Sequence, residues 1–149
     1  MGRIKSFRGK LDPTNQLEAQ NQIYLAGGES DTGYRVVKFD IMPVSPDGSH
    51  ESVVKLFKKK QSVIDMTIDF TDDSLIAAAW YAFEGSGSGD ATGYLTQFFD
   101  SQVINQDLFV TCAGGQSKLM NYYIEVEEFK MSGSEQAVVN FNAALLHGE

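Results

Sequence analysis

Alternation of apolar and polar side chains over short segments is the feature that most constrains the fold of this chain. In residues 34–42, Val37, Phe39 and Ile41 fall on one side of an extended backbone, and their neighbours Val36 and Lys38 fall on the other. A period of two is typical of a half-buried strand, because successive side chains of a strand point to opposite faces. The segment is therefore predicted to cover a core with one face only.

The same kind of segment recurs along the chain between turn signals such as Asp12-Pro13 and Pro46-Asp47-Gly48. We predict strands at 4–11, 20–25, 34–42, 51–58, 63–70, 108–112, 121–131 and 137–146. Many short strands with frequent turns favour a sandwich or a barrel. The prediction is one mainly β domain over residues 1–149, an antiparallel β-sandwich of jelly-roll-like type with a basic N-terminal arm at 1–11.

Two segments remain open between helix and strand. Residues 72–83 begin with Asp72 and Asp73, which could cap a helix, but the neighbouring strands favour a strand there. Residues 134–146 carry a milder form of the same ambiguity. Between them, residues 84–92 read EGSGSGDAT, and they are predicted to form a flexible loop that connects strands.

Charge is distributed unevenly along the chain, whose net charge is -8. Residues 1–60 hold ten Lys and Arg against seven Asp and Glu, whereas residues 61–149 hold two against thirteen. A chain of this kind could associate head to tail or present its basic arm to an acidic neighbour. The predicted interface residues are Arg3, Ile4, Lys5, Phe7, Arg8, Lys10, Lys58, Lys59 and Lys60.

No catalytic constellation is evident, and we predict a protein that is not an enzyme. The single cysteine, Cys112, lies in an apolar run, which is typical of a buried structural thiol. His50 lies in a segment predicted to be a polar loop, and His147 lies near the end of the sequence. Both are therefore predicted to be solvated surface residues. A pair of His50 and Cys112 would need an exposed thiol.

Cofactor and metal motifs are also absent, and none is predicted. The glycines at 85, 87 and 89 are followed by Asp90, which would repel the phosphates that a P-loop binds. Acidic residues such as Glu125 and Glu127 share one face of a predicted strand and have no EF-hand spacing.

Dedicated nucleic-acid binding is not predicted either. Lys55 and Lys58–Lys60 form a basic patch in sequence, but no aromatic RNA-binding motif accompanies it and the whole chain is acidic. No apolar segment approaches the length of a membrane helix, and no signal peptide is evident. We expect a protein that is synthesised in the cytoplasm and has no membrane partner.

Four stretches together resemble a known group of proteins. They are GRIKSFRG at 2–9, TGYRVVKF at 32–39, VINQDLFVTC at 103–112 and MNYYIEVEEFKM at 120–131. Their order resembles that in small uncharacterised virion proteins of tailed bacteriophages, notably those of marine bacteria. The resemblance implies a particle component, such as a capsid decoration protein, that is assembled in the host cytoplasm and binds copies of itself and other virion proteins.

Two other functions stay open at the level of sequence. The chain could be a carbohydrate-binding β-sandwich that uses Trp80, Tyr81, Tyr122 and Tyr123 as sugar platforms, which requires those rings to be exposed in a flat row. Alternation with Ile124 places Tyr122 in the core instead. A hydrolase with an unrecognised site is the remaining alternative.

Overall fold

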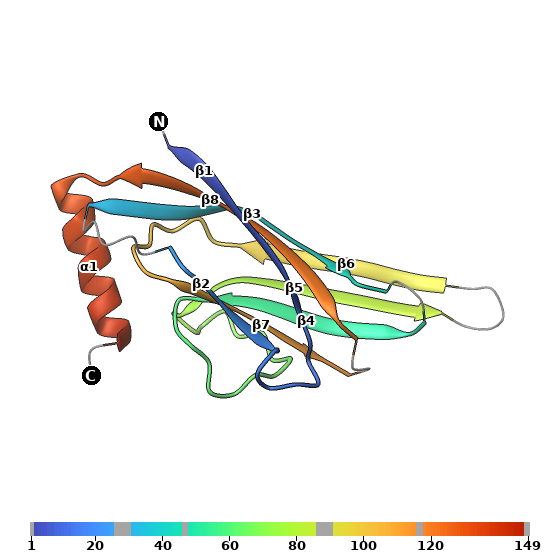
Figure 1. Cartoon of the computed structure of the whole chain (residues 1–149). Coiled ribbons are helices and arrows are strands. Elements are labelled where there is room, and N and C mark those ends of the chain that lie inside the picture. Colours follow the sequence, from blue (N-terminus) through green and yellow to red (C-terminus); the bar gives the residue numbers. More distant parts are fainter. Residues whose placement is uncertain (1, 26–30, 46–47, 86–90, 116–117, 148–149) are drawn as a thin grey trace.

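Two antiparallel sheets packed face to face make up most of the molecule (Figure 1). The computed structural model describes residues 2–25, 31–45, 48–85, 91–115 and 118–147. Its elements are β1 (Arg3–Leu11), β2 (Gln20–Ile23), β3 (Thr32–Pro43), β4 (His50–Phe57), β5 (Leu75–Gly85), β6 (Ala91–Phe99), β7 (Leu108–Gly114), β8 (Met120–Lys130) and the helix α1 (Gly133–His147). The predicted mainly β, antiparallel sandwich is confirmed.

The strand order shows how the chain crosses between the layers. Sheet A has three strands in the order β1-β8-β3, and sheet B has five in the order β2-β7-β4-β5-β6. The outer strands of the sequence pair with each other, β1 with β8 and β2 with β7, and this nesting is jelly-roll-like. In contrast to a symmetric jelly roll, β6 pairs with β5 in a hairpin, so sheet A is narrower than sheet B.

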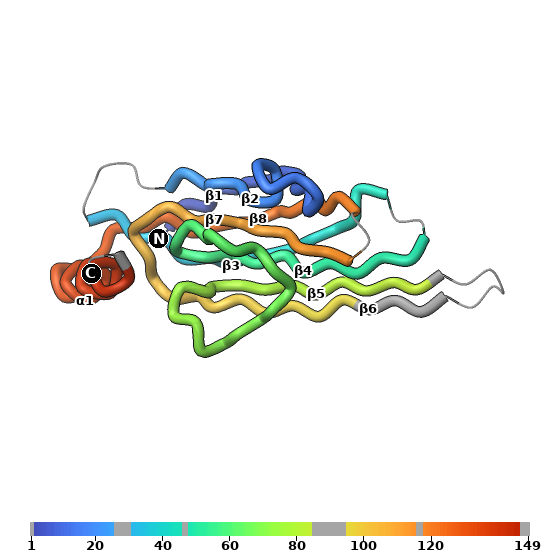
Figure 2. The backbone as a smooth tube through the Cα atoms, turned by 90° about the horizontal axis from the view of Figure 1, so that it is seen from below, coloured from blue at the N-terminus to red at the C-terminus, as the bar shows by residue number. Residues whose placement is uncertain are grey.

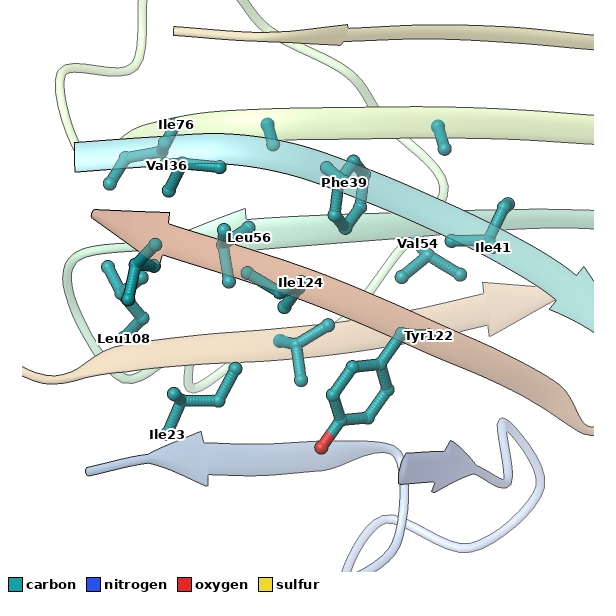
Figure 3. Close-up of a cluster of buried hydrophobic side chains, with 14 of the residues drawn as sticks. Ile23, Val36, Phe39, Ile41, Val54, Leu56, Ile76, Leu108, Tyr122 and Ile124 are labelled. Atoms are coloured by element: carbon teal, nitrogen blue, oxygen red, sulfur yellow. The ribbon is translucent and has the colours of Figure 1, made fainter. Parts of the chain in front are cut away.

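The core lies between the two sheets (Figure 3). Phe39 of β3 and Ile124 of β8 point from sheet A toward Val54 and Leu56 of β4 and Leu108 of β7. All five side chains are buried. Alternation put these residues on one face of each strand, and burial of that face is the main favourable contribution to the folded state.

A β-bulge changes the predicted face of one residue. The pairing register of β3 with β8 shifts between Val36 and Lys38. As a result Val36 is 1% exposed and packs in the core, whereas Val37 is 37% exposed. The prediction that Val37 shares the core face of Phe39 and Ile41 is therefore wrong. Val37 is the extra residue of the bulge, between Val36 and Lys38, and the face of the strand changes there.

The strand predicted at 63–70 does not form. Asp65 accepts a hydrogen bond from the Thr67 amide at 3.1 Å, and Asp69 accepts one from the Thr71 amide at 2.9 Å. An aspartate that binds the amide two residues ahead offers the backbone a turn in place of a sheet ladder. Aspartates every few residues thus produced the apparent alternation, and residues 58–74 instead run as an irregular segment across the outer face of sheet B (Figure 2).

The strand predicted at 137–146 is a helix. Ser132 and Glu135 form a capping box, in which the Ser132 amide donates to Glu135 Oε1 at 2.9 Å and the Glu135 amide donates to Ser132 Oγ at 3.2 Å. This reciprocal pair satisfies amides that a helix leaves free at its N-terminus. The helix lies at one end of the sandwich, where only one of its larger apolar side chains, Val139, is fully buried.

The other open segment resolves as a strand, because β5 covers 75–85. Strand β6 was not predicted, although its Tyr, Thr and Phe residues favour a strand. The predicted 84–92 loop is shorter than expected, since β5 continues to Gly85 and β6 begins at Ala91. Residues 86–90 lie outside the described part of the chain.

Candidate functional site

The predicted interface residues of the N-terminal segment lie on an edge strand. Strand β1 pairs with β8 from Arg3 to Leu11, and its other side has no strand partner in sheet A. Ile4, Arg8 and Lys10 are exposed, whereas Phe7 packs against the core. An edge strand offers both unpaired backbone groups and side chains to another molecule, so β1 is a candidate interaction surface.

Acidic residues of β8 balance part of the β1 charge. Lys5 Nζ lies 2.9 Å from Glu128 Oε2, and this hydrogen bond lowers the pKa of Glu128. Glu125 and Glu127 share the outer face of β8, as predicted, opposite Ser6 and Ile4 of β1. Arg8 faces Tyr123 in the pairing, so its guanidinium and the Lys10 ammonium remain on the side of sheet A that faces away from the core.

The lysines at 55–60 do not form one patch. Lys55 is buried, and its ammonium donates to Asp65 Oδ1 at 3.1 Å and to the Thr67 carbonyl at 2.6 Å. Lys58 is also buried, and its ammonium donates to Gln102 Oε1 at 2.8 Å. Burial lowers the pKa of Lys58, although nearby aspartates oppose this effect. Lys59 and Lys60 alone among these four are exposed.

A second charged surface, which we call the acidic segment, is formed by residues 61–74. The segment contains no Lys or Arg. Its charged residues are four exposed aspartates, Asp65, Asp69, Asp72 and Asp73. Lys55 holds the segment on sheet B through Asp65, and Gln20 holds it through two hydrogen bonds with the Gln61 backbone. Asp72 and Asp73 were considered only as possible helix caps, and the cluster was not predicted, although the repeated Asp-x-Thr/Ser spacing is a signal for it.

The basic strand and the acidic segment lie along opposite sides of the molecule (Figure 2). Strand β1 belongs to sheet A, and the acidic segment covers the outer face of sheet B. Arg3, Lys5, Arg8 and Lys10 are the only charged residues from Arg3 to Leu11. The chain therefore carries a basic edge strand, bordered by the glutamates of β8, on one side and the acidic segment on the other.

His50 does not lie in a solvated loop. It is the first residue of β4 and is 3% exposed, with Nε2 3.0 Å from Ser52 Oγ and its ring edge-on to Tyr81 at 5.0 Å. Burial lowers the pKa of His50, and the charge of Lys118 lowers it further. The prediction that His50 is a surface residue is wrong, because the start of β4 pairs with Phe83 of β5 and the His50 ring packs against Tyr81 of the same strand.

Cys112 is buried, as predicted, and it lies apart from His50. The β4–β7 pairing sets Cys112 beside Val54, four residues along β4 from His50. Burial raises the pKa of the Cys112 thiol to about 12, which keeps it protonated at neutral pH. A cleft of about 740 Å³ borders Cys112, and its other ionisable lining residue is Lys60. These groups are not arranged as a nucleophile and its base.

The four aromatic residues considered for sugar binding do not form a row. Tyr122 is buried, as predicted, while Tyr123 lies on the outer face of sheet A. Trp80 belongs to the outer face of sheet B and donates from Nε1 to Glu51 Oε2 at 3.0 Å, and Tyr81 packs against the core. Tyr122 and Tyr123 both border an open groove of about 690 Å³, which Arg8, Lys10 and Asp40 also line, but the Tyr122 side chain is buried.

Within the described parts of the chain, no group of His, Cys, Asp and Glu side chains is placed to hold a metal ion. Over the same residues, no helix has both the length and the apolar character needed to cross a membrane. Neither a protein-family model nor a curated protein matches this chain.

Proposed function

We propose that the protein is a non-enzymatic structural component of a virion, either a capsid decoration protein or another abundant particle protein. The resemblance of four stretches to small phage virion proteins supports this proposal. Two oppositely charged surfaces on a compact β-sandwich give it a physical basis, because repeated copies can associate through them. In this proposal the protein is assembled in the host cytoplasm and resides in the virion, where it binds copies of itself and other virion proteins.

The observation that carries the proposal is the separation of charge. In the proposed contact, the basic face of β1, with Arg8 and Lys10 exposed, meets the acidic segment of a neighbouring copy. Like charges on either surface oppose contact of that surface with itself. The contact is therefore head to tail, which generates rings or extended arrays rather than isolated pairs. Other acidic virion proteins could take the place of the second copy.

A direct test is to ask whether purified particles contain the protein. Mass spectrometry of density-purified phage that encodes this chain should detect it in stoichiometric amounts, resistant to a high-salt wash if other contacts hold it as well. Particles that lack the protein, with the chain found only in the lysate supernatant, would refute the virion role.

The charge contact has its own test in solution. Scattering or sedimentation of the purified protein should show larger species at about 0.01 M salt than at about 1 M salt, where charges are screened within about 3 Å. The double variant Arg8→Glu/Lys10→Glu should lose the low-salt species, while Arg8→Lys/Lys10→Arg, which keeps both charges, should retain them.

A compensating variant sharpens that test. Adding Asp69→Lys and Asp73→Lys to the Arg8→Glu/Lys10→Glu chain exchanges the sign of two charges on each surface, so that these four positions attract one another again, and should restore low-salt species at least in part. Failure to restore them, together with a normal circular dichroism spectrum, would show that the basic strand does not bind the acidic segment.

A carbohydrate-binding module remains the second candidate, and one observation favours it. Tyr123 borders the open groove of about 690 Å³ with Arg8, Asp40 and Asn121, a combination of one aromatic ring and several hydrogen-bonding groups that suits a sugar. Binding of a glycan that shifts the NMR signals of the Tyr123 ring, and that calorimetry shows to be lost in Tyr123→Ala, would support this function. No binder across the library would exclude it.

A further inference from the structure

The C-terminal helix exposes an apolar face that the sandwich does not cover. Val138, Phe141 and Leu145 are 61%, 63% and 67% exposed. Their spacing of three and then four residues aligns them on one side of α1, while Val139 on another side is buried. We call these three residues the apolar helix face.

Another exposed apolar side chain lies near the end of the helix. Phe70 lines one groove together with Leu145, and Lys58, Asp72, Asp73 and Asp100 line the same groove, so the apolar surface of the helix itself ends there. The ring of Phe70 packs edge-on against Phe98 of β6 with 4.4 Å between the centroids. A row of exposed apolar side chains such as Val138, Phe141 and Leu145 marks an interaction site more often than isolated exposed residues do.

We propose that the apolar helix face binds the same face of a second copy, in an antiparallel helix pair about a two-fold axis near Phe141. Charge is the argument for this occupant. The helix has no Asp, Glu, Lys or Arg from Gln136 to Leu146, although the chain carries a net charge of -8. A symmetric contact brings the same patch of two copies together, so like charges in the patch would repel each other. A patch without charges avoids this repulsion even in a strongly charged chain.

The flanking residues suit the same occupant. In paired helices, the positions beside the apolar seam carry the charges that select a different partner. Here two of those positions are Ala137 and Ala144, and a third is Asn142. These side chains carry no charge, so they do not favour a charged partner helix. In the antiparallel arrangement Val138 of each copy lies across from Leu145 of the other, and the alanines leave room for the helices to approach closely.

The size of the surface sets the expected strength. A helix of 15 residues is about 22 Å long. A helix pair of this length with the neighbouring Phe70 is smaller than a standard interface of about 800 Å² per partner. The pair is therefore a weak dimer that becomes important where many copies are concentrated on one particle.

Sedimentation equilibrium over a wide concentration series tests the proposal. The protein should show a monomer–dimer equilibrium that persists at about 1 M salt, because apolar contacts are not screened. Phe141→Asp should weaken dimerisation by about tenfold or more, since it buries a charge at the centre of the seam. Asn140→Asp is the matched control: it adds the same charge one residue away, on an exposed side of α1 outside the seam, and should leave the dimer intact.

The outcomes separate this contact from the charge contact of the proposed function. Association that persists in high salt and is lost in Phe141→Asp supports the helix pair, even if Arg8→Glu/Lys10→Glu has no effect. A strict monomer in high salt at every concentration would overturn it, as would equal loss in the Asn140→Asp control. Thermal unfolding of each variant should match that of the unmodified chain, because Phe141 and Asn140 are both exposed.

Discussion

At the scale of single residues, the fold opposes the protonation of His50. Its ring is buried against Tyr81, and burial, followed by the charge of Lys118, lowers its pKa from the ordinary value of 6.5. The unfolded chain therefore binds a proton at a higher pH than the folded chain does. It follows that the free energy of unfolding decreases as the pH falls below 6.5.

Urea unfolding between about pH 7.5 and pH 5 measures this effect, in a range above the ordinary pKa of the carboxyl groups. The stability of the unmodified chain should fall across that range, and the slope should be smaller in His50→Phe, which retains an aromatic ring but cannot titrate. Parallel slopes for the two proteins would show that His50 has an ordinary pKa in the folded state.

Lys55 presents the opposite case of a buried charge that stays paired. Asp65→Ala removes its carboxylate partner and leaves the ammonium with the Thr67 carbonyl and the ring of Phe57, whose centroid lies 5.4 Å away. We expect a loss of about 1 kcal/mol in unfolding free energy, kept small because Asp65 is half exposed. Hydrogen exchange should accelerate in residues 61–74 before it does in the core strands. Ser62→Ala, at an exposed residue of the same segment, is the control and should change neither quantity.

These two residues show what a local pattern cannot reveal. Nothing within a few positions of His50 indicates burial, and the apolar neighbours of Lys55 do not reveal the groups that bind its ammonium, because Tyr81, Asp65 and Thr67 come from elsewhere in the chain. The burial of Cys112 and Tyr122 was predictable, because each lies in a run whose own neighbours are apolar and alternate.

At the scale of elements, the contact between β1 and β8 depends on a glycine. A Cβ added at Gly9 would lie 2.6 Å from Tyr122 Oη and 2.8 Å from its Cζ. The Tyr122 ring is held in the core, and its hydroxyl accepts a hydrogen bond from Asn21 Nδ2 at 3.2 Å (Figure 3). No contact-free position is therefore open to the extra methyl group unless the ring moves.

Gly9→Ala should consequently lower the unfolding free energy by about 1–3 kcal/mol, the usual cost of overpacking. Gly133→Ala provides the comparison, because a Cβ there meets nothing within 4 Å and α1 begins at that residue. It should leave stability unchanged or raise it slightly. Denaturant melts of the two variants decide the matter, and equal stabilities would mean that Tyr122 has room to shift.

Elements were predictable where period two coincided with real burial on one face, as in β3 and β8. The prediction was wrong at 63–70 and 137–146 for different reasons. In the first, turns made by Asp65 and Asp69 imitate alternation. In the second, the Ser132–Glu135 capping box was a readable helix signal that the apparent alternation outweighed. The β-bulge at Val37 was not predicted, because no characteristic residue composition marks a bulge in the sequence.

At the scale of the whole molecule, the charge asymmetry survives folding as two separate surfaces. Sequence alone could state that the first 60 residues are more basic than the rest. It could not place the acidic segment opposite β1, because that placement depends on which sheet each strand joins. The apolar helix face was likewise hidden by the expectation of a strand at 137–146, in which Phe141 and Leu145 would have pointed into a core.

The pairing of β1 also changes what removal of the N-terminus would test. From sequence, residues 1–11 could be a separable arm whose loss abolishes assembly and spares the fold. Residues 3–11 instead pair along β8, and Leu11 and Phe7 contact the core. Their deletion would leave sheet A with two strands, β8 and β3, and would open the core on that side.

Deletion of residues 1–11 should therefore lower the cooperativity and midpoint of thermal unfolding and increase the binding of a dye specific for apolar surface. Arg8→Glu/Lys10→Glu should do neither, because those side chains are exposed, while still removing low-salt association. Differential scanning calorimetry of both proteins distinguishes the two roles of the strand. A truncated chain that unfolds as cooperatively as the full chain would mean that β1 contributes to assembly alone, and that the five strands of sheet B with β8 and β3 suffice for the domain.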